Sequence, residues 1–253
     1  MFDNIIGFFA FFLVELFNLT GNLGISLILF TVLVRSLLLP LTIPSIRAQD
    51  RIKAIQPEIK KLKNKFGKDK QGLQKAQLEL YKKYNVNPIA GCLPQLVQIG
   101  IFIILYQVLI RFLNAPIANG VGVETAFLWL DLALPDRSLV LPLLAASSQL
   151  ILSLMIAPGA EREDSVPNDS KSKKVQKENK KEEDFAEMAA KMQQQMIFIF
   201  PVMTGVIAYQ FPSGLALYWI VTTVFSIAQQ YFISGPGGLV LYYQRLRNKL
   251  VKA

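Results

Sequence analysis

The chain has 253 residues, 52% of them hydrophobic, and a formal net charge of +9. It has no histidine and a single cysteine, which excludes histidine acid–base catalysis, histidine-ligated zinc or haem, and an internal disulfide. Several apolar runs reach about 20 residues, the length that a helix needs to cross a bilayer, so the sequence predicts an all-α, multi-pass membrane protein.

Residues 1–21 are apolar, but Asp3, Asn4 and Glu15 interrupt them, and the run Ile5–Val14 is too short to span a bilayer. We interpret this segment as an extracytoplasmic helix that lies along the membrane surface. A short additional span is the alternative interpretation.

Residues 22–46 form the first predicted transmembrane span and contain Arg35. A charge at the bilayer centre costs about 2.5–3.5 kcal/mol on insertion scales, so an arginine there indicates a functional site. Helical periodicity places Gly24, Thr31 and Thr42 on the same face as Arg35. The alternative is an arginine whose long side chain reaches the membrane surface.

Residues 47–86 form a basic segment, with twelve basic and four acidic residues between 47 and 84. Apolar residues recur at helical spacing on both sides of a turn at 67–72, which predicts a helical hairpin whose two apolar stripes pack together. The stripes consist of Ile52, Ile55, Ile59, Leu62 and Phe66, followed by Leu73, Ala76, Leu80 and Tyr84. The excess of basic residues predicts a cytoplasmic location.

Residues 87–233 contain the second to fifth predicted spans and a flexible cytoplasmic loop at 158–191, and residues 234–253 form a basic cytoplasmic tail. The predicted spans are 88–113, 138–157, 194–211 and 215–233. Five spans place the amino terminus outside and the carboxyl terminus in the cytoplasm. The predicted location is a plasma or inner membrane, and an organellar membrane is the alternative.

No Asp or Glu occurs in the five predicted spans to pair with Arg35. Because a desolvated, unpaired guanidinium is strongly destabilising, its surroundings must be hydrated, polar or open to an anionic ligand. Polar residues at helical spacing in the other spans are candidates to line such a site: Gln95, Gln98, Gln149, Ser153, Trp219, Thr222, Ser226 and Gln229. Ordinary hydrogen bonding between membrane helices is the alternative explanation for many of them.

Six segments carry a resemblance to a known family. They are VRSLLLPLT (34–42), NPIAGCLPQLVQIGIF (87–102), FLWLDLALPD (127–136), LPLLAASSQ (141–149), QQQMIFIFPV (193–202) and FPSGLALYW (211–219). Because these segments occur in this order around five predicted spans, the chain resembles the YidC/Oxa/Alb family of membrane protein insertases. The resemblance implies a hydrophilic groove that is open to the cytoplasm and to lipid but closed to the outside. It places Arg35, Thr31, Gln149, Tyr218 and Trp219 in that groove.

We therefore expect a membrane protein insertase and chaperone, not an enzyme, with no cofactor and no metal site. The expected substrate-binding groove consists of Arg35, Thr31, Gln98, Gln149, Tyr218, Trp219 and Thr222. Expected partners are nascent membrane proteins, the ribosome, a Sec-type translocon and the lipid bilayer, but not DNA. A small transporter or channel that binds an anionic solute at Arg35 is the competing hypothesis, and a structural assembly factor is a third.

Overall fold

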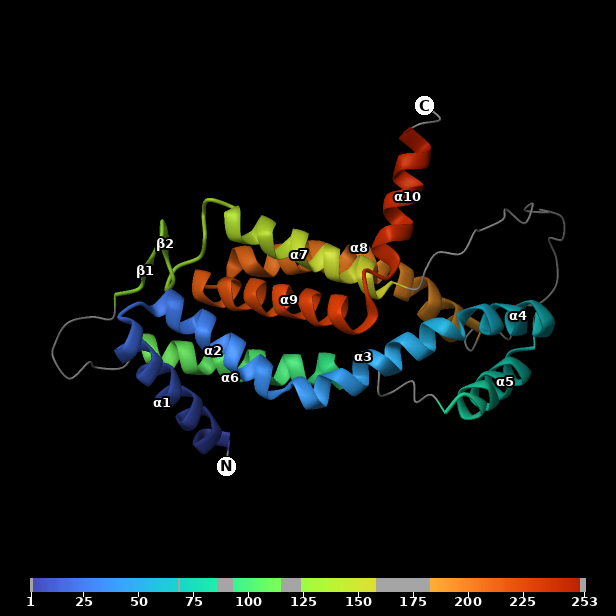
Figure 1. Ribbon diagram of the computed structural model, residues 1–253, viewed down its shortest axis with the longest axis horizontal. Helices are drawn as coiled ribbons and strands as arrows, with labels where there is room; N and C mark the ends of the chain where they lie inside the picture. Colours follow the sequence, from blue (N-terminus) through green and yellow to red (C-terminus); the bar gives the residue numbers. More distant parts are fainter. Residues whose placement is uncertain (1, 68, 86–92, 115–123, 158–182, 251–253) are drawn as a thin grey trace.

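The computed structural model describes residues 2–67, 69–85, 93–114, 124–157 and 183–250 (Figure 1). In this part of the chain the fold is helical except for one short hairpin of two strands. The elements in chain order are α1 (Phe2–Thr20), α2 (Leu23–Leu37), α3 (Leu39–Ala54), α4 (Gln56–Phe66), α5 (Lys70–Lys83), α6 (Leu93–Asn114), β1 (Ala126–Phe127), β2 (Leu130–Asp131), α7 (Val140–Ile156), α8 (Glu183–Gln210), α9 (Ser213–Ser234) and α10 (Gly238–Leu250).

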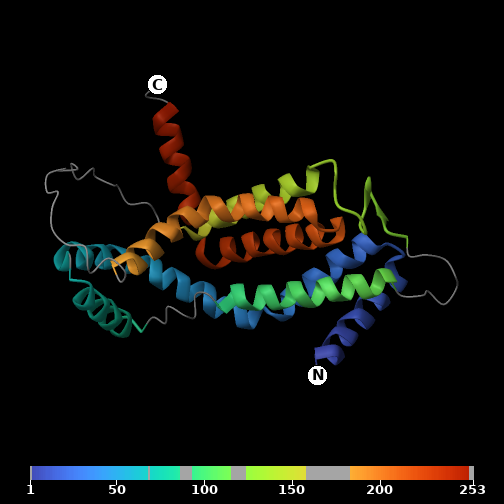
Figure 2. The ribbon, with the colours of Figure 1, turned by 180° about the vertical axis from the view of Figure 1, so that it is seen from behind.

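The long helices form one elongated bundle, with the strands at one end and the α4–α5 hairpin at the other (Figures 1 and 2). Helix α7 packs on α8 and α9, α9 packs on α2, and α1 packs on α2 and α6. Leucines such as Leu27, Leu109 and Leu215 form the main core between these helices. Small residues bring α7 and α8 together, because a Cβ atom on Gly205 would lie 3.1 Å from the Cβ atom of Ala146.

The predicted first span is broken. Helices α2 and α3 meet at Leu38 with a bend of 67°. Pro40 lies in the first turn of α3, where its missing N–H group is tolerated, but proline disfavours a continuous helix through the preceding residues. Helix α3 then continues to Ala54, across the boundary predicted between residues 46 and 47, and α4 begins at Gln56.

One described helix, α9, is long and apolar enough to cross a membrane alone, and the bent pair α2–α3 passes the same test together. Shorter apolar helical segments cover Ile6–Thr20, Val97–Phe112, Val140–Ile156 and Ile197–Gln210. The arrangement of five spans therefore stays a prediction. Residues 86–92, before α6, and most of the predicted loop at 158–191 lie outside the described residues.

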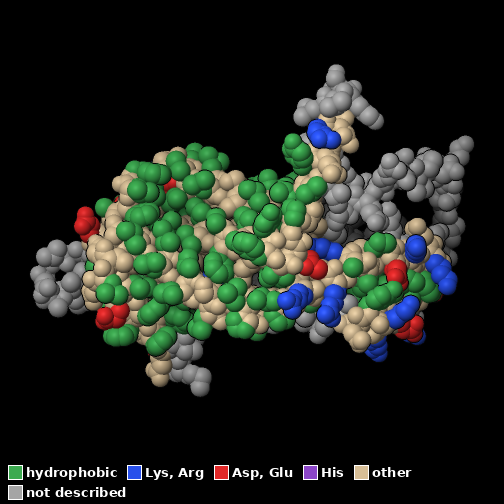
Figure 3. All heavy atoms as spheres, in the orientation of Figure 1, with side chains coloured by type: hydrophobic (Ala, Val, Ile, Leu, Met, Phe, Trp, Pro, Cys, Tyr) green, Lys and Arg blue, Asp and Glu red, His purple; other side chains and the backbone are tan. Residues whose placement is uncertain are grey.

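The side chains on the face in Figure 3 are segregated by type. Apolar side chains cover the bundle on this face, whereas the Lys and Arg side chains gather mainly over the α4–α5 hairpin and the neighbouring end of α3. Large exposed apolar residues of the bundle include Leu33 on α2, Leu143 on α7, and Phe198 and Val202 on α8. Such an apolar belt next to a charged end is typical of a helical bundle in contact with lipid.

The α4–α5 hairpin is held together by its own small core. Ile59 of α4 and Leu80 of α5 are buried together with Ile55, the residue just before α4, and Leu62 and Tyr81 pack against them. These residues include members of both apolar stripes in the sequence, so the two stripes do pack against each other. The Asp69 side chain caps α5 by accepting a hydrogen bond from the backbone N–H of Gly72 at 3.0 Å.

The strands and the loop after them close one end of the bundle, which the sequence did not predict. The backbone N–H and the hydroxyl of Ser213 donate to the carbonyl of Leu134 at 2.8 and 2.7 Å, and the N–H of Gly214 donates to the carbonyl of Leu132 at 3.0 Å. These bonds satisfy donors in the first turn of α9. A Cβ atom on Gly214 would lie 3.1 Å from the Leu132 carbonyl oxygen, so glycine permits this close approach.

Candidate functional site

Arg35 lies in the last turn of α2, three residues before the bend at Leu38. The side chain of Asn22 caps the start of α2 by accepting a hydrogen bond from the N–H of Ile25 at 3.1 Å. Buried residues such as Leu27 then fix α2 against α9. This packing leaves Arg35 half-buried, facing both α6 and α9.

Gln98 of α6 joins Arg35 to Tyr218 of α9. Nη2 of Arg35 donates a hydrogen bond to Oε1 of Gln98, and Nε2 of Gln98 donates to the Tyr218 hydroxyl oxygen at 3.1 Å. The network fixes the orientation of the amide, because a guanidinium can only donate. Tyr218 is 2% exposed, so three helices meet at this polar chain in the interior of the bundle.

Among the residues that the structure describes, the positive charge of Arg35 has a neutral hydrogen-bond partner, Gln98. Within the described ranges, no carboxylate lies within 4.0 Å of its guanidinium, and Gln98 is the acceptor that it contacts. A guanidinium has five N–H donors, so this one acceptor leaves most of them for water or for an anion. The arrangement can therefore attract a carboxylate group without first breaking an ion pair.

Three polar residues of α9 lie on the face that includes Tyr218. Thr222 follows Tyr218 by four residues and Gln229 follows Thr222 by seven, which keeps all three on one side of the helix. The Thr222 side chain is buried next to the Tyr218 phenol, without a hydrogen bond of normal geometry to a described residue. Gln229 donates to the hydroxyl of Thr42 on α3 at 3.1 Å. This second contact links the bent helix pair to α9.

The other residues expected in the groove have different environments. Thr31 is 1% exposed, and its hydroxyl donates to the Leu27 carbonyl within the same helix at 2.6 Å. Gln149 on α7 is also buried. Trp219 packs edge-on against Phe102 of α6, with the ring centroids 5.3 Å apart. No hydrogen bond among described residues joins Thr31, Gln149 or Trp219 to Arg35, so the structure brings together Arg35, Gln98 and Tyr218, with Thr222 alongside.

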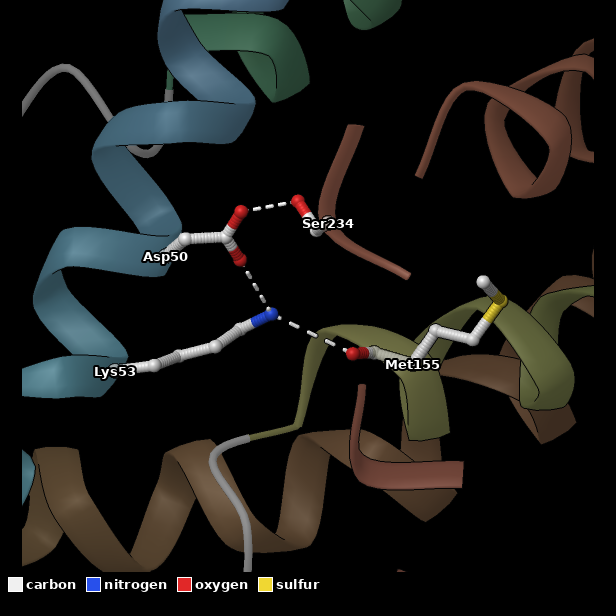
Figure 4. A network of polar contacts seen from close by, with 4 residues as sticks. All are labelled: Asp50, Lys53, Met155 and Ser234. Carbon is white, nitrogen blue, oxygen red and sulfur yellow. Dashed lines mark hydrogen bonds and ion pairs between the residues drawn. The ribbon is translucent and has the colours of Figure 1, made fainter. Parts of the chain in front are cut away.

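A second polar cluster lies where α3, α7 and α9 meet (Figure 4). Asp50 of α3 accepts hydrogen bonds from Lys53 at 3.1 Å and from the hydroxyl of Ser234 at the end of α9. Lys53 also donates to the carbonyl of Met155 on α7 at 3.4 Å. The sequence did not reveal this cluster, because Asp50 and Lys53 look like an ordinary surface pair at i and i+3. Their partners lie far away in the chain.

Asp136 organises the start of α7 at the opposite end of the bundle. Its carboxylate accepts hydrogen bonds from the backbone N–H groups of Ser138 and Leu141 at 2.8 and 2.7 Å, and from the Ser138 hydroxyl at 2.6 Å. Burial alone would raise the pKa of Asp136, but these bonds outweigh burial and hold the pKa below its ordinary value. In the sequence, Asp136 stood out only as the last residue of the segment FLWLDLALPD.

A helical bundle with an apolar belt and a half-buried arginine held by neutral side chains defines a membrane protein with a polar site in its interior. Residues 15–242 match the family described as 60Kd inner membrane protein. The membrane protein insertase YidC of Fusobacterium nucleatum is 35% identical over 231 residues, which are 91% of this chain and 95% of that protein. The membrane protein insertase MisCA of Bacillus subtilis is 36% identical over 225 residues, 87% of this chain and 73% of that protein.

A solved crystal structure of an active YidC insertase has the same fold, with a TM-score of 0.63 and 25% identity over 92% of this chain and 47% of that one. The chain therefore belongs to the YidC family of membrane protein insertases. These findings confirm the family that the six sequence segments indicated, and with it a location in a membrane.

Proposed function

We propose that this protein inserts nascent membrane proteins into the lipid bilayer and that Arg35 binds acidic residues of the client segment being translocated. Membership of a family whose relatives are named insertases supports the general function. The observation that carries the role of Arg35 is its half-buried guanidinium with Gln98 as a neutral partner.

The attraction between Arg35 and a client carboxylate is stronger inside the bundle than in water. Two unit charges 4 Å apart interact by about 1 kcal/mol in bulk water but by about 4 kcal/mol at an effective dielectric constant of 20. A client carboxylate that reaches Arg35 thus recovers part of the free energy it loses on leaving water. Gln98 and Tyr218 hold the guanidinium in place without neutralising it.

The proposed path is a hydrophilic groove lined by Arg35, Gln98, Tyr218 and Thr222, with Thr31, Gln149 and Trp219 as further members. Such a groove shortens the low-dielectric distance that a polar client flank has to cross. The apolar client segment then moves sideways into lipid, because the transfer removes apolar surface from water. In the proposed topology five spans surround this groove, the amino terminus lies outside, and the α4–α5 hairpin and the tail lie in the cytoplasm.

The α4–α5 hairpin is the proposed contact for the ribosome or a Sec-type translocon. Exposed basic side chains, including Lys61, Lys65, Lys75, Lys82 and Lys83, supply its positive charge. A polyanion such as ribosomal RNA binds such a surface with strong dependence on salt.

Reconstitution of the pure protein into liposomes tests the proposal. A short client with acidic residues in its translocated segment should insert with the wild type, partly with Arg35→Lys and poorly with Arg35→Ala. When the acidic residues of that segment are replaced by neutral ones, the amount of client inserted should differ much less among the three proteins. Equal insertion of the acidic client by wild type and Arg35→Ala would overturn the role of Arg35. Failure of insertion by every protein, with transport of an anionic solute instead, would favour the transporter hypothesis.

A further inference from the structure

The last helix, α10, runs in a different direction from the bundle. Figures 1 and 2 show it projecting sideways from the end of α9, across the direction of α7, α8 and α9. Helix α9 is the described helix that passes alone as a membrane span. A helix that leaves the end of a span and crosses its direction lies along the membrane surface rather than through the bilayer.

A packed turn fixes this direction. Gly237 has a positive φ of 52°, and a Cβ atom on it would lie 2.2 Å from the carbonyl oxygen of Met155. A Cβ atom on the next residue, Gly238, would lie 2.5 Å from the carbonyl oxygen of Leu154. The two glycines therefore let the turn pack directly on the backbone at the end of α7. Helix α10 thus starts from a turn packed on the bundle, not from a free linker.

Exposed aromatic side chains lie at the end of α9, close to the start of α10, and on α10 itself. Tyr231 and Phe232, in the last turns of α9, are 58% and 84% exposed, and their rings meet edge-on. Tyr243 on α10 is 65% exposed. Aromatic residues are enriched at membrane–water interfaces, where the ring is buried among headgroups. Their position indicates that the surface of the bilayer lies at this end of α9.

The sequence of α10 and the residues after it is basic and amphipathic. No acidic residue occurs after Glu187, and apolar residues recur in α10 at spacings of four, three and four, as on one side of a helix. These apolar residues are Leu239, Tyr243, Leu246 and Leu250. The basic residues of α10 are Arg245, Arg247 and Lys249.

We propose that α10 is an anchor that lies on anionic lipid headgroups in the leaflet at the carboxyl end of α9. Tyr243 enters the headgroup region, and the basic residues neutralise lipid phosphates. Its direction across α9 and its exposed Tyr243 favour a lipid surface over RNA, whose recognition needs the charge but not an apolar side. The proposal depends on membrane embedding and not on the role of Arg35.

A label at position 243 tests the proposal in the full-length protein. Tyr243→Cys, in a Cys92→Ala background, is coupled to an environment-sensitive fluorophore and reconstituted in phosphatidylcholine vesicles with or without phosphatidylglycerol. We expect phosphatidylglycerol to shift the emission to the blue and to protect the label from aqueous iodide. High salt or the triple change Arg245→Gln, Arg247→Gln and Lys249→Gln should reverse the protection, because each basic residue contributes about fivefold to the affinity for an anionic surface.

A label at Phe198→Cys, on the exposed apolar face of α8, provides the matched reference and should be protected in both lipids. Thermal unfolding of the triple variant in detergent should match that of the wild type, which separates lipid binding from a folding defect. The proposal is overturned if the label at 243 stays equally open to iodide in both lipids while the label at 198 is protected. Protection that appears only after ribosomes are added would overturn it as well, in favour of RNA.

Discussion

Gln98 of α6 donates a hydrogen bond to Tyr218 of α9, which lies 120 residues further along the chain, with 3.1 Å between Nε2 and the phenol oxygen. Because the other end of the same amide accepts from Arg35, this one side chain fixes where the charge of α2 lies relative to α9. Gln98 is therefore the residue through which the bundle positions its half-buried charge.

Gln98→Leu should lower stability and misplace Arg35. The change removes the acceptor of a charged donor and the donor to Tyr218, and such a loss costs about 1–3 kcal/mol. We expect a lower melting temperature in detergent and weaker insertion of acidic clients. Gln107→Leu, a glutamine on the same helix, is the matched control. A Gln98→Leu protein with wild-type stability and wild-type insertion would show that the amide does not position Arg35.

Gln98→Glu should separate stability from function. A carboxylate at this position forms an ion pair with Arg35 and occupies the charge that the proposed function needs for clients. Insertion of an acidic client should therefore fall, although the melting temperature of the protein in detergent stays at the wild-type value. If Gln98→Glu leaves the insertion of acidic clients unchanged, Arg35 does not contact the client directly.

Ser234→Ala should loosen the junction of α3 with α9. Its hydroxyl donates to the carboxylate of Asp50, and hydrogen bonds to charged groups contribute about 1.5–3 kcal/mol. Ser234 and Asp50 are half-buried, and contact with solvent weakens their hydrogen bond. We therefore expect a loss of about 1 kcal/mol in the free energy of unfolding, measured by thermal unfolding. Ser147→Ala is the matched control, because that exposed hydroxyl donates to the Leu144 carbonyl within its own helix and does not join two helices in the described part of the chain. Equal effects of the two changes would contradict the role of the junction.

Asp136 should make stability depend on pH in the acid range. Its pKa is lower in the folded protein than the ordinary value of 3.8, so its contribution is fully present above that value and is lost as pH falls through the folded pKa. The melting temperature of the wild type should fall more steeply below about pH 4 than that of Asp136→Asn. Glu124→Gln, at an exposed position, is the control for the removal of one negative charge. Parallel curves for wild type and Asp136→Asn would contradict the capping role.

Much of the helical fold could be predicted from local pattern. The structure has a helix at each of two predicted spans: α9, Ser213–Ser234, covers 215–233, and α7, Val140–Ile156, lies within 138–157. Long apolar runs bounded by Gly and Pro predict helices without any knowledge of the tertiary contacts. The break at Leu38 was harder to predict, because a proline near a helix start is compatible with both a kink and a stop. The strands at 126–131 are too short to produce a periodic pattern.

The candidate site was only partly visible in the sequence. Arg35 was conspicuous because a charge in an apolar run is costly, and Gln98 was found by spacing. Tyr218 came from the family resemblance alone, since a tyrosine in an apolar helix has no distinctive pattern. The contacts of Asp50 could not be predicted, because periodicity assigns a residue to a face of its helix but does not name the partner across the interface. Arg111, near the end of the predicted second span, is a second charge there, and it pairs with Asp3 of α1 at 2.7 Å.

The most direct test of the central claim reverses both charges. Arg35→Glu should abolish insertion of a client with aspartates in its translocated segment, because the site then repels them. The same client with lysines in place of those aspartates should insert better with Arg35→Glu than with the wild type. Insertion is measured as protection of the translocated segment from protease in liposomes containing the pure protein. If Arg35→Glu impairs both clients equally, Arg35 serves the fold and does not bind acidic client residues.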